Sequence, residues 1–167
     1  MFINKLMNTL RPSWVRPWKG SNVIRVNSCG GRLKLIERMP AELGNCLRAG
    51  SDTTLMVWAD CDDDCADGEA LKERFWQEAQ RQNISKTDFE RVVFIFAKDR
   101  LENWIEFLRD GKTDESVEGP RIKHNRIVSE AAIALAKRCQ DGRPDNTLPS
   151  SLQWSCKNWR ALTSSMK

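Results

Sequence analysis

The stretch DCDDDC, residues 60–65, places four aspartates beside two cysteines directly after an apolar run. Asp60 and Asp62 have the spacing D-x-D, which in an extended chain directs both side chains to the same side. Carboxylate oxygens are the ligands that a hard divalent cation such as Mg²⁺ prefers. A cation held there would neutralise developing charge on a phosphodiester and activate water, so these residues predict a metal site for phosphoryl chemistry.

The same aspartates also have a simpler interpretation. Aspartate is common in turns because its side chain accepts hydrogen bonds from nearby backbone N–H groups, and it often caps the helix that follows. Asp67 has the position of such an N-cap, at the start of a helical pattern over residues 67–83. The spacing therefore leaves a metal site and a capped turn open.

Six cysteines are spread through the chain, at positions 29, 46, 61, 65, 139 and 156. A chain of this length forms a core without disulfides, so we expect reduced thiols. Cys61 and Cys65 have a C-x3-C spacing that zinc could use, but no second close pair follows and His124 is the only histidine. Structural zinc is therefore the minor alternative.

Two apolar runs must position the acidic residues if these act together. Both runs, residues 53–59 (TTLMVWA) and 91–99 (RVVFIFAKD), are rich in β-branched and bulky apolar side chains. The first is followed by the charged residue Asp60, and the second ends in the charged residues Lys98 and Asp99. This composition predicts two buried strands. The segment NVIRV, residues 22–26, is a third and shorter candidate.

Parallel neighbouring strands would bring the turns that follow them to one edge, where open α/β sheets bind ligands. Those turns are residues 27–31, 60–65 and 97–103. The carboxylates expected to meet there belong to Asp60, Asp62, Asp64, Asp99 and Glu102. Lys98 or Arg100 would then stabilise the charge of a phosphate in the transition state.

Helical patterns fill most of the remaining chain. They cover residues 32–50, 67–83, 100–111, 125–142 and 149–165, and Pro40 is expected to interrupt or kink the first of them. Strands alternating with helices predict an α/β fold with a small, mostly parallel sheet flanked by helices and a helical C-terminal extension. The expected α/β domain spans residues 22–162, and residues 163–167 form a tail.

Residues 1–21 have a different composition. Pro12 and Pro17 argue against regular structure, and tryptophans stand among basic residues. We expect an arm that docks on a partner, on nucleic acid, or back onto the domain. The residues expected to make this contact are Arg11, Trp14, Arg16, Trp18 and Lys19.

The net charge of +4 is unevenly distributed along the chain. Residues 1–50 carry a net +7, residues 51–118 a net −9 and residues 119–167 a net +6. This pattern suits an acidic centre that holds cations and basic ends that hold a polyanion such as nucleic acid, although the ends could equally balance the middle within one fold. No apolar run approaches the ~20 residues that cross a bilayer, and the N-terminus lacks a secretory pattern, so we expect a cytoplasmic protein.

The segments LMVWADCDDD and VVFIFAKDRLENWIEFL resemble Toprim-like proteins, whose fold is shared by topoisomerases, primases and overcoming-lysogenization-defect nucleases. The likeness, over residues 22–110, is particularly to small stand-alone Toprim-related proteins encoded beside ATPases in bacterial defence loci. It implies a three-layer sandwich in which Asp60 and Asp62 are the metal-binding D-x-D and Glu102 is the acidic residue before a tryptophan. The implied function is a Mg²⁺- or Mn²⁺-dependent nuclease of an anti-phage defence system, with an ATPase partner.

One position departs from the pattern of that family. The family has a glutamate followed by glycine after its first strand, whereas this chain has NSCGG, in which Ser28 and Cys29 offer no carboxylate. The alternative function is therefore a catalytically incomplete interaction or regulatory subunit that binds a partner protein or nucleic acid. A third hypothesis places nucleic-acid binding in the basic ends alone. The chain has no phosphate-loop or dinucleotide fingerprint that would support an NTPase or a dehydrogenase.

Overall fold

The computed structural model describes residues 2–10, 26–51, 53–62, 64–122, 124–141 and 147–165. Its elements in chain order are α1 (Phe2–Leu10), α2 (Arg32–Ala49), β1 (Met56–Cys61), α3 (Gly68–Arg81), α4 (Lys86–Phe89), β2 (Val93–Lys98), α5 (Leu101–Asp110), α6 (Asn125–Asp141) and α7 (Ser150–Ser165). Among the described residues, no helix combines the length and the apolar character needed to span a membrane.

The two strands pair in parallel along their whole length, from Met56 opposite Val93 to Cys61 opposite Lys98. Their carboxyl ends therefore lie together at one edge. The backbone N–H of Asp99 continues the pairing by donating to the carbonyl oxygen of Cys61 at 3.0 Å. This confirms the mixed α/β class and the parallel sheet that the sequence predicts, with two strands among the described residues.

β1 lies further along the chain than the predicted strand 53–59. It begins at Met56 and continues through Cys61, because Asp60 still pairs with Ala97 of β2. Asp60 is thus a strand residue rather than the first residue of the turn. Its position at the end of an ordered strand fixes the direction of its side chain more firmly than a loop would.

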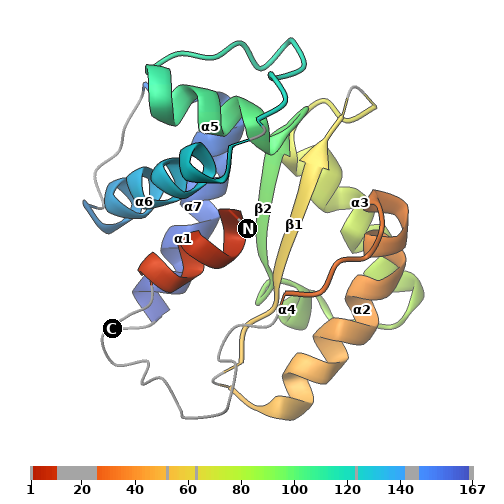
Figure 1. Cartoon of the computed structure of the whole chain (residues 1–167). Coiled ribbons are helices and arrows are strands. Elements are labelled where there is room, and N and C mark those ends of the chain that lie inside the picture. Colours follow the sequence, from red (N-terminus) through yellow and green to blue (C-terminus); the bar gives the residue numbers. More distant parts are fainter. Residues whose placement is uncertain are drawn as a thin grey trace.

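The sheet separates two apolar clusters. Successive side chains of β2 belong alternately to one cluster and to the other. Val93, Ile95 and Ala97 lie in the cluster with α1, α5, α6 and α7, while Phe94 and Phe96 lie in the cluster with α2, α3 and α4. Successive side chains of a strand point to opposite faces, which explains this division. Figure 1 shows the strands between α2 and α3 on one side and α1 and α6 on the other.

Side chains of α7 occupy the edge of β2 that faces away from β1. The Ser155 hydroxyl accepts from the Phe96 N–H and donates to the Phe96 carbonyl oxygen, both at 3.0 Å, and the Asn158 amide donates to the Phe94 carbonyl oxygen at 3.0 Å. Because these backbone groups are satisfied inside the chain, this edge cannot accept another strand. The strand expected at residues 22–26 falls mostly outside the described residues, and Val26, which is described, is not in a strand.

The expectation of irregular structure near the N-terminus is wrong for residues 2–10, which form α1. Phe2 and Leu6 stand one helical turn apart and are 3% and 1% exposed, in the cluster that also holds residues of α6. The arm was expected to dock on a partner, on nucleic acid or back onto the domain, and residues 2–10 pack back onto the domain. Residues 11–21 lie outside the described residues, so the contacts expected of the following five side chains stay predictions: Arg11, Trp14, Arg16, Trp18 and Lys19.

Two further elements differ from expectation. α2 runs unbroken through Pro40, so the predicted interruption does not occur; Pro40 and its neighbours Met39 and Leu43 are buried, and this packing stabilises the helix. The short helix α4 was not expected, although Ser85 caps it by accepting from the Asp88 N–H at 3.1 Å. α7 continues to Ser165, so the first three residues of the expected tail are helical.

Replacing Leu6 with alanine tests whether α1 belongs to the core. Because Leu6 is buried, Leu6→Ala should lower the free energy of unfolding by about 2–5 kcal/mol. Urea denaturation followed by circular dichroism measures the change. The neighbouring Lys5 is exposed, so Lys5→Ala should change it little; equal effects of the two substitutions would contradict the packing of α1.

Candidate functional site

Asp60 lies at the end of β1, against the start of α5. Its carboxylate accepts a hydrogen bond from the backbone N–H of Leu101, the first residue of α5. Arg100, which precedes that helix, makes no side-chain capping bond. Asp60 therefore acts as an N-cap supplied by a neighbouring strand, and the positive end of the helix dipole favours its charge.

The charges of two other carboxylates act on Asp60 at this edge of the sheet. Partial desolvation, followed by the negative charges of Asp62 and Glu102, raises the pKa of Asp60 from 3.8 to about 6. The Arg100 guanidinium and the Leu101 N–H act in the opposite direction without cancelling this rise. Since the residue is exposed overall, its desolvation reflects contact with α5 rather than complete burial. An added cation would relieve the remaining repulsion.

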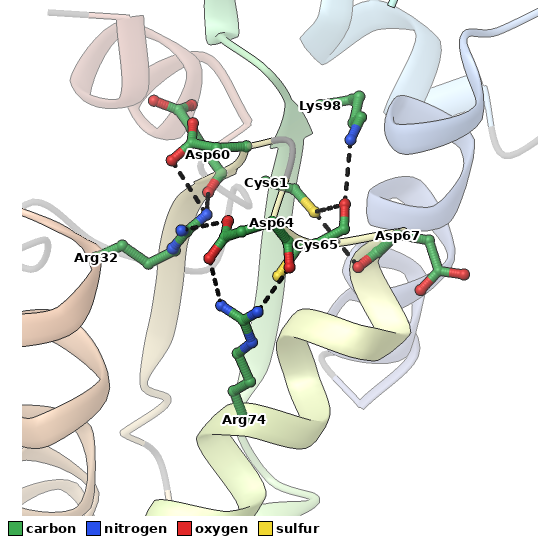
Figure 2. Close-up of polar contacts among 9 residues, drawn as sticks. Arg32, Asp60, Cys61, Asp64, Cys65, Asp67, Arg74 and Lys98 are labelled. Atoms are coloured by element: carbon green, nitrogen blue, oxygen red, sulfur yellow. Dashed lines mark hydrogen bonds and ion pairs between the residues drawn. The ribbon is translucent and has the colours of Figure 1, made fainter. Parts of the chain in front are cut away.

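The carboxylate of Asp64 forms ion pairs with two arginines, Arg32 and Arg74. Figure 2 shows Arg32 and Arg74 reaching its two carboxylate oxygens, at 2.5 Å from Arg32 Nη2 and 2.7 Å from Arg74 Nη1. Hydrogen bonds from Arg74 and then Arg32 hold the pKa of Asp64 below its ordinary value. Arg32 also pairs with Asp62 at 3.1 Å. The structure therefore does not bring Asp64 together with Asp60 and Glu102.

Lys98 lies on the other face of the sheet from Asp60. It pairs in register with Cys61, and its ammonium group donates to the carbonyl oxygen of Cys65 at 3.1 Å, as Figure 2 shows. A contact between Lys98 and a phosphate at Asp60 is therefore not supported. Of the two cations proposed for that role, Arg100 is the one beside Asp60.

Asp99 forms the sharp turn that brings α5 to the site. Its φ of +56° lies in the left-handed region, which is uncommon for a residue other than glycine. The turn allows α5 to begin three residues after the end of β2, at Leu101. This places Glu102 in the first turn of the helix, within electrostatic reach of Asp60.

Cys61 and Cys65 are buried free thiols beside the acidic turn. Burial, followed by the charge of Cys65, raises the pKa of Cys61 to about 12, so this thiol is protonated at neutral pH. Zinc binds thiolates, and the structure shows no group of three metal-ligating side chains among the described residues, so these contacts do not favour a zinc site. The structure shows no disulfide among the cysteines with described side chains, which do not include Cys139, and their reduced state stays a prediction.

The carboxylates at this edge of the sheet could supply only a few of the ligands that a magnesium ion needs. In the part of the chain that the structure describes, no three His, Cys, Asp or Glu side chains form a group that could hold a metal ion. Mg²⁺ often needs only one or two carboxylates, because it keeps several waters and takes further ligands from substrate phosphates. Asp60 and Glu102 are hard oxygen donors whose mutual repulsion a cation would lower. The two residues fit an ion that the substrate helps to hold.

Arg32 and Arg74 are the site residues that sequence reasoning missed. Arg32 follows Gly-Gly at the start of α2, and it reaches an aspartate 32 positions away in the chain. No local pattern predicts such a distant pairing. Arg74 could have been found, since it stands two helical turns after the N-cap Asp67 and so lies on the same side of α3 as the acidic turn.

Comparisons of the chain with protein-family models, with curated proteins and with solved structures found no match. The Toprim-like resemblance therefore remains a prediction that rests on the two sequence segments.

The pH dependence of stability distinguishes Asp60 from Asp64. Because the folded-state pKa of Asp60 is raised, its ionisation destabilises the fold as pH rises through about 6. Asp60→Asn keeps an oxygen for the Leu101 N–H. This variant should melt at a higher temperature than the unmodified protein at about pH 8, and the difference should shrink as the pH falls toward about 4.

Asp64→Asn is the matched control with the opposite sign. The folded-state pKa of Asp64 is lowered, so the ionised group stabilises the fold above its ordinary pKa. The variant should melt at a lower temperature at about pH 8, and its deficit should fade only below about pH 4. A destabilising effect of Asp60→Asn at high pH would contradict the repulsion described for this residue.

Proposed function

We propose that the protein is a Mg²⁺-dependent nuclease with a Toprim-like three-layer sandwich, working in an anti-phage defence system with an ATPase partner. The observation that carries this proposal is the meeting of Asp60 and Glu102 at the carboxyl ends of adjacent parallel strands, with Arg100 beside them. A parallel sheet between two helical layers supports the sandwich. The defence context and the ATPase rest on the resemblance of the two sequence segments.

Asp60 and Glu102 would hold the ion, and Asp62 would add negative charge nearby. When bound, Mg²⁺ would neutralise phosphodiester charge and supply an activated water. The Arg100 guanidinium would bind a phosphate oxygen and stabilise the charge that forms during cleavage. The positive end of the α5 dipole would favour the same anion.

A second candidate function explains the same contacts without cleavage. Asp60 caps α5, while Arg32 and Arg74 neutralise Asp62 and Asp64, so the acidic turn is accounted for without a cation. The segment NSCGG supplies no carboxylate where the family has one. In this candidate the protein is an interaction subunit that binds nucleic acid or a partner protein.

Cleavage of plasmid, linear and single-stranded nucleic acid with Mg²⁺ or Mn²⁺ tests the first proposal, both for the protein alone and together with any ATPase encoded beside it. Asp60→Asn and Glu102→Gln should each lower the rate by about 100-fold or more, because each replaces a charged carboxylate ligand with a neutral amide that holds the cation more weakly. Asp110→Asn, at the far end of α5, is the matched control and should cleave normally.

Cleavage by Asp60→Asn at the unmodified rate would show that the activity arises elsewhere. Absence of cleavage by the folded protein together with its partner would reject the nuclease and favour the interaction subunit.

The basic N-terminal segment supplies a test of nucleic-acid binding that applies to both candidates. Changing Arg11, Arg16 and Lys19 together to glutamine should weaken binding and reduce the slope of log K against log salt by up to ~3. Deleting residues 1–20 would be unsuitable because it also removes α1 from the core. The matched control changes three exposed lysines elsewhere, Lys34, Lys137 and Lys157, and an equal loss there would contradict a specific role for the segment.

A further inference from the structure

The segment after α5, residues 111–122, folds back over the start of that helix. Glu118 in this segment forms an ion pair with Arg100, the residue before α5. Arg100 is also the cation whose charge acts on Asp60. The same guanidinium thus faces a carboxylate of the loop and the carboxylates of the sheet edge.

A buried amide fixes the position of the loop. Asn103 is fully buried, and its side-chain nitrogen donates to the carbonyl oxygens of Lys98 at 3.4 Å and of Val117 at 3.2 Å. This joins the end of β2 to the residue before Glu118. Gly119 is also required, since a Cβ there would stand 2.0 Å from Asn103 Oδ1.

The other part of the loop is fixed as well. Glu115 accepts hydrogen bonds from the Ser150 hydroxyl at 2.8 Å and from the backbone N–H of Ser151 at 3.2 Å, at the start of α7. The Thr113 hydroxyl donates to Glu106 at 3.0 Å. Glu118 is therefore presented to Arg100 by an anchored loop, unlike an ordinary surface pair between two free side chains.

We propose that Glu118 is an internal competitor for the anion-binding site at Arg100. Its carboxylate occupies the guanidinium that a phosphate group of the substrate binds, and so lowers the affinity for nucleic acid. Carboxylate and phosphate bind the same planar donor fork, and an anchored carboxylate competes at a high effective concentration. The pair stays accessible to an incoming anion, with side chains 36% and 59% exposed. The identity of the substrate rests on the proposed function.

Binding of a fluorescent single-stranded DNA oligonucleotide in EDTA tests this competition without cleavage. Glu118→Gln should tighten binding by about 3- to 10-fold, because the neutral amide releases Arg100 while keeping the shape of the side chain. Arg100→Gln should weaken binding. In the double variant, Glu118→Gln should have no further effect, since its action passes through Arg100.

Asp114→Asn is the matched control, because it removes one charge from the same loop without a contact to Arg100. It should leave the affinity unchanged. An equal gain with Asp114→Asn, or a gain from Glu118→Gln that persists without Arg100, would show general charge relief and overturn the competition. The proposed competition would also be overturned if Glu118→Gln bound the oligonucleotide with unchanged affinity, or if neither the unmodified protein nor Glu118→Gln bound it.

The outcome is separate from that of the nuclease proposal. If Glu118→Gln binds more tightly but the protein does not cleave, the competition stands and the nuclease falls. If the protein cleaves and Glu118→Gln binds as before, only the competition falls.

Discussion

Parallel pairing of β1 with β2 is the constraint on which the rest of the structure depends. Because Cys61 is opposite Lys98, both acidic turns leave the sheet at the same edge. The left-handed turn at Asp99 then starts α5 immediately, so that the backbone N–H of its first residue, Leu101, donates to Asp60. Ser155 and Asn158 of α7 close the other edge of β2, which leaves the side of β1 as the place where the sheet could extend.

Charge at this edge is divided between two environments. Asp64, and with it Asp62, is neutralised by arginines of α2 and α3, and this part of the turn is structurally satisfied. Asp60 and Glu102 repel each other, and the nearby Arg100 is shared with Glu118. The second environment therefore gains most from an added cation or phosphate, which is why we place ligand binding there rather than across the whole DCDDDC turn.

The sequence predicted the elements whose signals are local. The N-cap Asp67 and the helix that follows it were predicted from local pattern alone, and the structure confirms both. The face on which Lys98 lies was not predictable, because it depends on strand register and a shift of one residue reverses every side chain. Arg32 reaches Asp64 across 32 positions, beyond any local pattern. α1 was missed because Pro12 and Pro17 dominated the interpretation, although Phe2 and Leu6 have helical spacing.

The central claim is that Asp60 and Glu102 hold a divalent cation at the carboxyl edge of the sheet. Adding Mn²⁺ in small amounts to the ¹⁵N-labelled protein tests it directly, because the paramagnetic ion broadens the amide signals nearest to it. We predict that signals of residues 60–62 and 100–103 disappear first, and that excess Mg²⁺ restores them. Broadening centred elsewhere, or none at these residues, would contradict the claim and favour a protein that works by binding alone.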